Sequence, residues 1–204
     1  MICIIDYGAG NIESVRKALE YIGAECVVSS DANVLMNSDA AILPGVGSFG
    51  DAMENLRARN LEKPISEFVK SGKPFLGICL GLQILFESSE ESPGVRGLSL
   101  LKGKIVRIPD GEGLKIPHMG WNSLNIEKQG GLFKDIPDNP YVYFVHSYYL
   151  RAEEDIVTST AEYGITIHAS VAKENLWACQ FHPEKSGELG IELLKNFVGK
   201  IEVE

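Results

Sequence analysis

Two short segments, far apart in the sequence, carry side chains that together could cleave an amide. The first is Gly77-Ile-Cys-Leu-Gly81, which has the spacing of a G-x-S-x-G nucleophile motif with a thiol in place of the hydroxyl. The second is His182-Pro-Glu184, where an imidazole and a carboxylate stand two positions apart. A cysteine nucleophile needs a base, and the base needs a third group to orient it. The two segments supply all three groups.

Cys79 is expected at a sharp turn between a strand and a helix. The apolar run Phe75–Ile78 predicts a buried strand, and Leu80–Glu87 predicts a helix. The apolar residues of this helix share one face: Leu82, Leu85 and Phe86. Glycines on either side let the backbone pass without side-chain clashes. The unpaired amides and dipole at a helix start favour a thiolate, so we predict that Cys79 is an activated nucleophile.

His182 is the best candidate for the base because it directly follows the apolar run Leu176–Phe181, a predicted strand. In an extended chain, residues i and i+2 project to the same side, and Pro183 fixes φ between them. Glu184 can then accept a hydrogen bond from one ring nitrogen and leave the other facing Cys79.

The three remaining histidines are weaker candidates. His168 alternates with isoleucines along a predicted strand, so we expect a solvated side chain there. His118 and His146 follow apolar segments and are compatible with the core, an interface or a binding site.

A glycine-rich loop, Pro44-Gly-Val-Gly-Ser-Phe-Gly50, contains a literal G-x-G-x-x-G between a predicted strand and helix. Dinucleotide binding also needs an acidic residue at the end of the next strand, and the nearest candidate, Glu67, falls within a predicted helix. Two other interpretations stay open. The loop could be a tight turn at the sheet edge, or its amides could face the group that Cys79 attacks and form an oxyanion hole.

The first half of the chain alternates strands and helices, which predicts a parallel sheet. Short apolar strands are expected at Ile2–Ile5, Glu25–Ser29, Ala40–Leu43 and Phe75–Ile78. The helix after the first strand ends at Gly23 and has this inward stripe: Ile12, Val15, Leu19 and Ile22. Residues 51–71 predict a helix that Pro64 divides in two.

The sequence pattern changes in the second half, which has a polar loop over 89–97 and several short runs that predict strands. These runs are Gly103–Ile108, Tyr141–Val145, Asp155–Glu162, Ile165–Ala172 and Leu176–Phe181. Tyr163-Gly164 is a hairpin turn candidate, and Ser186–Phe197 predicts a closing amphipathic helix. The predicted fold is α/β: an open, largely parallel sheet with helices on both faces and extra antiparallel strands in the C-terminal half. We expect residues 1–204 to form a single domain.

Composition argues against several classes of protein. The net charge of −9 disfavours binding to nucleic acid or to anionic membrane surfaces. No apolar run approaches the roughly 20 residues of a membrane span, and Met1–Asp6 lacks the basic start of a signal peptide. The four cysteines are far apart and show no metal or disulfide spacing. We expect a cytoplasmic protein without a metal or cofactor.

Taken together, these motifs resemble the class I (triad) glutamine amidotransferases. The segments that carry the resemblance are Pro44–Gly47, Gly77–Gln83 and Phe181–Glu184. Three further segments are similar to one branch, the glutaminase subunits of imidazole glycerol phosphate synthases from histidine biosynthesis: Asp6–Asn11, His118–Asn122 and Tyr143–Tyr148. The resemblance runs from Met1 to the last helix.

The resemblance implies a reaction and a set of site residues. Cys79 would attack the side-chain amide of glutamine and form a γ-glutamyl thioester, ammonia would leave, and water would release glutamate. His182 would move the protons and Glu184 would hold its tautomer. The oxyanion would meet the amide of Leu80 and one from the glycine-rich turn, at Val46 or Gly47. The implied substrate contacts are Gly45, Gln83, Ser147 and Tyr148.

The resemblance also implies a partner, a (β/α)₈-barrel cyclase subunit that receives the ammonia within a heterodimer. The residues implied at the interface or ammonia passage are Asn11, Met119, Trp121, Tyr143 and Lys185. By residue type, Trp121 is a candidate interface anchor. The residues alone favour ordinary roles: Asn11 as a helix cap, Tyr143 as a strand aromatic and Lys185 as an exposed lysine.

Two rival functions are compatible with parts of the sequence. One is another triad enzyme, such as a cysteine peptidase, a γ-glutamyl hydrolase or the glutaminase of another pathway. Asp6–Asn11 and His118–Asn122 favour the synthase branch over these enzymes. The other rival is a non-catalytic interaction module, and the intact set of Cys79, His182 and Glu184 argues against it.

Overall fold

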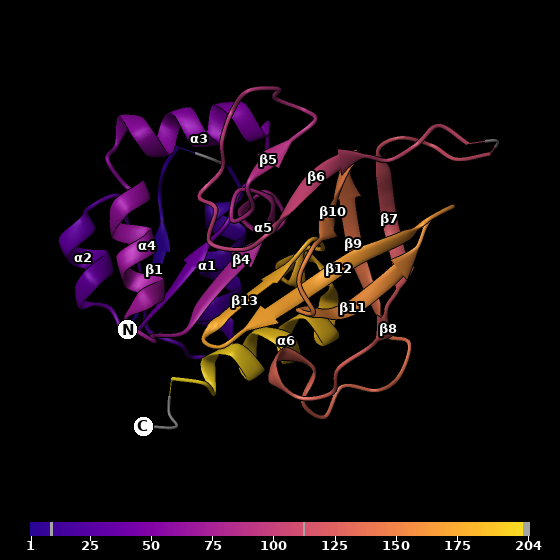
Figure 1. The fold of residues 1–204 in the computed structure, drawn as a ribbon. Coiled ribbons are helices and arrows are strands. Elements are labelled where there is room, and N and C mark those ends of the chain that lie inside the picture. Colours follow the sequence, from indigo (N-terminus) through magenta and orange to yellow (C-terminus); the bar gives the residue numbers. More distant parts are fainter. Residues whose placement is uncertain (9, 112, 202–204) are drawn as a thin grey trace.

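The computed structural model describes residues 1–8, 10–111 and 113–201. A mixed sheet of eleven strands runs through the molecule, and a separate two-stranded sheet lies beside its antiparallel half (Figure 1). No helix in this described part is long and apolar enough to cross a membrane.

One half of the large sheet is parallel, in the order β2-β1-β3-β4-β13. The bounds are β1 Ile2–Ile5, β2 Cys26–Ser29, β3 Ala40–Leu43, β4 Phe75–Ile78 and β13 Leu176–Cys179. All five strands were predicted. The decisive pairing is that of β13 with β4, in which Cys179 lies opposite Ile78. Both strands end at the same edge of the sheet. The turn at Cys79, which follows β4, therefore lies next to the segment that follows β13.

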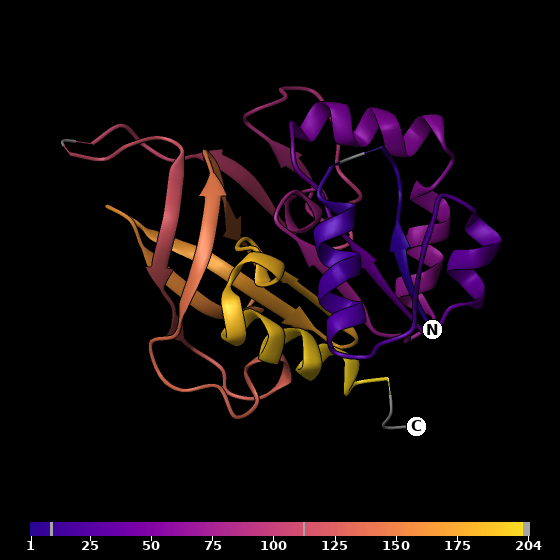
Figure 2. The ribbon, with the colours of Figure 1, turned by 180° about the vertical axis from the view of Figure 1, so that it is seen from behind.

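Helices cover both faces of the parallel half, as predicted. α1 Ile12–Tyr21 and α6 Gly187–Val198 lie on one face (Figure 2), and α2 Ala32–Asn37, α3 Phe49–Ala58 and α4 Glu62–Lys70 lie on the other. Along β1, Ile2 and Ile4 pack into the core with α1 and α6, while Cys3 and Ile5 pack into the opposite core. This alternation explains why the buried strands are apolar at every position.

The other half of the large sheet is mostly antiparallel and includes the predicted hairpin. The bounds are β5 Ser88–Ser89, β6 Gly103–Arg107, β8 Asn125–Ile126, β10 Tyr148–Ala152, β11 Val157–Glu162 and β12 Thr166–Lys173. β11 and β12 pair across a turn in which Gly164 has a φ of 68°. The separate sheet pairs β7 His118–Ser123 with β9 Tyr141–His146. Short 3₁₀ helices are η1 Gly131–Phe133 and η2 Pro183–Lys185.

Some predicted elements need correction. The helix after Cys79 is α5 Leu80–Gln83, which is much shorter than predicted and gives the helix dipole little length over which to act. The chain then turns, although Leu82, Leu85 and Phe86 are all fully buried. The sequence analysis missed α2, β7 and β10 because short segments with mixed polarity carry little periodic signal.

The break between α3 and α4 was also placed wrongly. The first helix ends at Ala58 and the second begins at Glu62, so the break precedes Pro64. Pro64 lies in the first turn of α4, where a backbone N–H would have no partner within the helix.

Candidate active site

Cys79 occupies a strained turn between β4 and α5. Its φ of 54° and ψ of −106° are unfavourable for a residue with a side chain. Its backbone N–H donates to the carbonyl oxygen of Cys179 on β13 across 2.8 Å, which holds the turn. Gly81 must be glycine, because a Cβ there would lie 1.8 Å from the carbonyl oxygen of Leu43. The structure thus has the sharp nucleophile turn that the glycine spacing predicted.

His182 and Glu184 form a buried pair just beyond the end of β13. The two side chains are 1% and 0% exposed, and His182 Nδ1 lies 2.7 Å from Glu184 Oε1. Two backbone contacts fix the histidine: its N–H donates to the carbonyl of Tyr143, and its carbonyl accepts from the Ser186 hydroxyl. Among the described residues, His182 Nε2 has no hydrogen-bond partner, so the second ring nitrogen is available to move a proton.

The electrostatic balance at His182 favours the charged imidazolium. Burial opposes the charge, but the adjacent Cys79 thiol and the Glu184 carboxylate outweigh it and raise the pKa of His182 to about 10. A buried histidine whose pKa is strongly shifted by specific neighbours is typical of catalytic sites. The arrangement can therefore hold a thiolate and an imidazolium side by side.

Asn11 also contacts the Glu184 carboxylate. Its side-chain amide donates to Glu184 Oε1, which is also the oxygen that contacts His182. Asn11 adopts a left-handed backbone with a φ of 72° immediately before α1, and its side chain makes no capping hydrogen bond to that helix. The sequence analysis implied a place for Asn11 at an interface or ammonia passage, and it missed this contact.

The glycine-rich turn after β3 lies beside Cys79. The Tyr7 hydroxyl donates to the carbonyl of Pro44 across 2.8 Å, and a Cβ on Gly45 would lie 2.2 Å from that hydroxyl. Gly47 has a φ of 111°, which favours glycine. Glu67 lies in α4 and not at a strand end, so the acidic residue of a dinucleotide fold is missing there.

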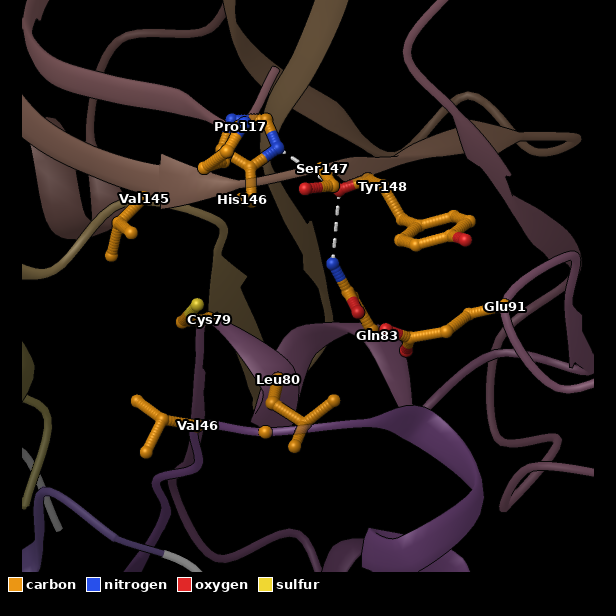
Figure 3. A pocket seen from close by; sticks show the side chains of 11 residues that line it. Val46, Cys79, Leu80, Gln83, Glu91, Pro117, Val145, His146, Ser147 and Tyr148 are labelled. Atoms are coloured by element: carbon orange, nitrogen blue, oxygen red, sulfur yellow. Dashed lines mark hydrogen bonds between the residues drawn. The ribbon is translucent and has the colours of Figure 1, made fainter.

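A cavity of about 340 Å³ opens in front of the Cys79 thiol (Figure 3). Its lining includes seven residues that the sequence analysis placed at the site: Val46, Gly47, Cys79, Leu80, Gln83, Ser147 and Tyr148. The other lining residues are Glu91, Pro117, Val145 and His146. Gly45 is beside this cavity through its contact with Leu80 but does not line it. The volume is at the small end of the range for ligand pockets.

Gln83 is part of the buried wall of this cavity. Its side-chain nitrogen donates to the carbonyl oxygen of Tyr148 and to Gln180 Oε1, both across 3.0 Å. Figure 3 shows the first of these bonds crossing from α5 to the segment that carries Ser147.

Comparison with known proteins identifies the family. The family model described as "Glutamine amidotransferase class-I" matches residues 3–201 of this chain. The chain belongs to the class I glutamine amidotransferase family. It is 52% identical to "Imidazole glycerol phosphate synthase subunit HisH" of Bacillus cereus strain G9842, over 99% of this chain and 96% of that protein. The protein of the same description from Methanothermobacter thermautotrophicus is 50% identical, over 97% of this chain and 98% of that one.

Solved structures confirm the predicted fold class of this amidotransferase. A crystal structure of a glutamine amidotransferase superposes with a TM-score of 0.78 at 20% identity and covers 100% of both chains. The structure of PurLQS from Thermotoga maritima gives a TM-score of 0.75 at 22% identity, over 98% of both chains. At such low identity, these likenesses concern the fold alone.

The residues that the resemblance assigned to a partner lie outside the cavity. Met119 and Trp121 are 62% and 56% exposed on β7. The ring of Trp121 meets the edge of Tyr143 on β9 at 6.2 Å between centroids. Lys185 is exposed in η2, directly after Glu184. Trp121 and Tyr143 lie next to the segment that follows the His182–Glu184 pair. The Tyr143 N–H donates to the Ser186 hydroxyl, and Trp121 would lie 3.9 Å from a Cβ on Gly187.

The sequence analysis left the histidines of the middle segment open, and the structure places them. His118 Nδ1 lies 3.1 Å from His146 Nε2, and His146 Nδ1 donates to the carbonyl oxygen of Tyr148. Burial lowers the pKa of His118 to about 4 and that of His146 to about 3, so both are neutral. His168 is half-buried and accepts a hydrogen bond from the backbone of Ala152, which corrects the expectation of a solvated side chain.

The sequence analysis also missed Gln180. Its side-chain nitrogen lies 3.6 Å from the Cys79 sulfur, and the residue is fully buried. The only available signal was its place two residues before His182, at the end of the predicted strand. Within the described residues, no cluster of three His, Cys, Asp or Glu side chains could hold a metal ion.

Proposed function

We propose that this chain is the glutaminase subunit of an imidazole glycerol phosphate synthase. It hydrolyses glutamine to glutamate and ammonia and passes the ammonia to a cyclase subunit. The cyclase makes imidazole glycerol phosphate and aminoimidazole carboxamide ribotide in histidine biosynthesis. The observation that carries the proposal is the strained Cys79 turn, with the buried His182–Glu184 pair beside it and a small cavity in front of it.

In the acylation half of the reaction, the Cys79 thiolate attacks the side-chain carbonyl carbon of glutamine and forms a carbon–sulfur bond. The carbonyl electrons move to the oxygen and give a tetrahedral oxyanion. The His182 imidazolium donates its proton from Nε2 to the amide nitrogen, and ammonia leaves as the carbon–nitrogen bond breaks. A γ-glutamyl thioester and a neutral His182 remain.

In the deacylation half, neutral His182 accepts a proton from water as the water oxygen attacks the thioester carbon. The second tetrahedral intermediate collapses, the carbon–sulfur bond breaks, and glutamate leaves. The thiolate and the imidazolium are restored. Glu184 keeps Nδ1 protonated throughout, and the Asn11 amide holds the carboxylate in place.

Cavity-lining groups bind glutamine and stabilise the oxyanion in this proposal. Gln83, Ser147 and Tyr148 lie on the cavity wall and suit the polar groups of an amino acid. The oxyanion is met by the backbone amide of Leu80 and by one amide of the turn, at Val46 or Gly47, with Gly45 adjacent to both. Removing one such donor typically costs about 100-fold in rate or more.

The partner is a (β/α)₈-barrel cyclase subunit, which forms a heterodimer with this chain in the cytoplasm. Met119 and Trp121 are large apolar side chains that remain exposed on one strand, as expected of an interface before its partner binds. Tyr143 and Lys185 extend this surface toward the buried pair. Asn11 lies between Glu184 and the start of α1, at the inner border of the same surface.

The test is reconstitution with the cyclase subunit. With glutamine as nitrogen donor, the complex is expected to make both products, and the Cys79→Ala complex is expected to make neither. With ammonium salts, the Cys79→Ala complex is expected to keep synthesis, since the cyclase then needs no glutaminase. Glutamine-dependent synthesis by the Cys79→Ala complex would contradict the proposal.

A further inference from the structure

Gln180 contacts the predicted nucleophile from the buried side. Its side-chain nitrogen lies 3.6 Å from Cys79 Sγ, and the residue is 0% exposed. Gln180 is not among the residues that line the cavity that would hold glutamine. Its backbone N–H donates to the carbonyl of Ala169 on β12, so the residue is held by the sheet.

The surroundings decide which end of the Gln180 amide faces the sulfur. An amide oxygen and nitrogen look nearly alike, and their positions must follow from the hydrogen-bond network. The carbonyl oxygen of Tyr148 can only accept, so Gln83 must present its NH₂ group to it. The second N–H of Gln83 then needs an acceptor, which is Gln180 Oε1 at 3.0 Å. The NH₂ group of Gln180 is thereby directed at Cys79.

We propose that Gln180 is a catalytic residue that donates an N–H to the Cys79 sulfur and stabilises its thiolate. The inference rests on the proposed function and adds a residue to it. A hydrogen bond to a charged acceptor is about twice as strong as one between neutral groups, so the contact favours the thiolate over the thiol. It acts alongside the imidazolium of His182 and does not obstruct the attack of the sulfur on a ligand in the cavity.

The sharpest variant is Gln180→Glu, which keeps the oxygen that accepts from Gln83 and removes the donor to sulfur. Gln180→Leu removes both functions at similar size. Gln129→Glu is the matched control, because it makes the same chemical change at an exposed glutamine that does not line the cavity. Circular dichroism and thermal melting establish that each variant is folded.

The readout is the rate at which iodoacetamide alkylates Cys79, followed by mass spectrometry of the Cys79 peptide. The reaction is run at several pH values, because the thiolate and not the thiol is the form that is alkylated. Gln180→Leu leaves the ionisable groups around the sulfur, His182, Glu184, Tyr7 and Cys179, unchanged, whereas Gln180→Glu adds a carboxyl group beside them. A slower reaction in both variants therefore identifies the lost N–H donor as the cause. We expect alkylation about 10-fold slower in both Gln180 variants and unchanged in the control.

Hydrolysis of glutamine in the complex provides a second readout. Because Gln180 does not line the cavity, kcat is expected to fall by about 10-fold in Gln180→Glu while KM stays the same. Unchanged alkylation and unchanged kcat in a folded Gln180→Leu protein would overturn the inference, because leucine has no donor for the sulfur. If the unsubstituted complex does not hydrolyse glutamine, the proposed function fails, while alkylation still tests the Gln180 contact.

If the variants do not fold, an NMR measurement on the unsubstituted chain tests the contact between Gln180 and Cys79. The sequence has glutamines only at positions 83, 129 and 180, so ¹⁵N-glutamine labelling gives three side-chain NH₂ signals. Alkylation of Cys79 is expected to shift the signal of Gln180 and leave that of Gln129 in place. If the Gln180 signal does not move, the contact is absent and the inference is wrong.

Discussion

The backbone N–H of Leu80 donates to the carbonyl oxygen of Gly45 across 3.3 Å. This amide is one of the two that the proposed mechanism assigns to the oxyanion. While it is bonded to Gly45, it cannot also meet the oxygen of a tetrahedral intermediate. We infer from the proposed mechanism that this contact belongs to a resting arrangement and that the Gly45–Gly47 turn shifts when the site becomes fully active.

We predict that the isolated chain hydrolyses glutamine slowly and that the cyclase, with its own ligand bound, accelerates it. The expected gain is about 100-fold, the effect of one restored oxyanion donor. Release of glutamate, measured with and without the partner, checks this prediction. Equal turnover in the two conditions would show that the Leu80–Gly45 contact does not limit the reaction.

The exposed Trp121 is predicted to anchor the cyclase. Replacing an aromatic residue at the centre of an interface typically costs about 2 kcal/mol or more, so Trp121→Ala is expected to weaken binding about 30-fold. Tyr21→Ala is the control, because Tyr21 is 79% exposed at the end of α1 and is not among the residues that the proposal assigns to the interface. Titration calorimetry gives both dissociation constants. A loss of the same size in both variants would argue against Trp121 as the anchor.

The nucleophile turn is predicted to depend on Gly81 for its stability. A Cβ at this position would overlap the Leu43 carbonyl oxygen at 1.8 Å, so Gly81→Ala is expected to lower the free energy of unfolding by about 3 kcal/mol. Gly199→Ala is the matched control, because a Cβ there meets no atom closer than 3.4 Å and the φ is −61°. Urea denaturation compares the two. A Gly81→Ala protein as stable as the control would contradict this description of the turn.

The buried His118–His146 pair predicts how stability depends on pH. The pKa of His146 is lowered from 6.5 to about 3, so the unfolded chain takes up this proton first as the pH falls. The contribution of His146 to stability is therefore complete above pH 6.5 and is lost toward pH 3, by about 1.4 kcal/mol per pH unit.

To isolate the contribution of His146, the free energy of unfolding is measured against pH for the His146→Gln variant and for the unsubstituted chain. The fall in stability between about pH 6.5 and 4.5 is expected to be less steep in the variant by about 1.4 kcal/mol per pH unit. His168 does not contact His146 and cancels in the difference, and the pKa of His118, which contacts His146, is lowered by burial in the folded chain. Parallel pH profiles in urea denaturation would mean that His146 is not held neutral in the folded state.

The parts of the fold and site that the sequence predicted are those that short local patterns determine. Runs of apolar residues predicted β1, β3 and β4 residue for residue. The glycines around Cys79 predicted its turn, because the neighbouring backbone leaves no room for a Cβ at Gly81. The His-Pro-Glu segment predicted the 2.7 Å contact between His182 and Glu184, since Pro183 leaves the pair little freedom.

The parts that the sequence did not predict depend on contacts between distant segments. The directed hydrogen bonds from Tyr148 through Gln83 and Gln180 join three elements, and no local spacing indicates them. The His118–His146 contact likewise follows from the pairing of β7 with β9, and β7 itself was missed. α5 is shorter than its apolar pattern because the chain after it turns to cover the core.

The central claim is that Cys79 is the nucleophile that attacks glutamine. Its most direct test is labelling of the complex with a diazoketone analogue of glutamine, followed by mass spectrometry to locate the adduct. We predict one adduct, on Cys79, which an excess of glutamine prevents. An adduct on any other residue, or no adduct in the presence of the cyclase, would contradict it.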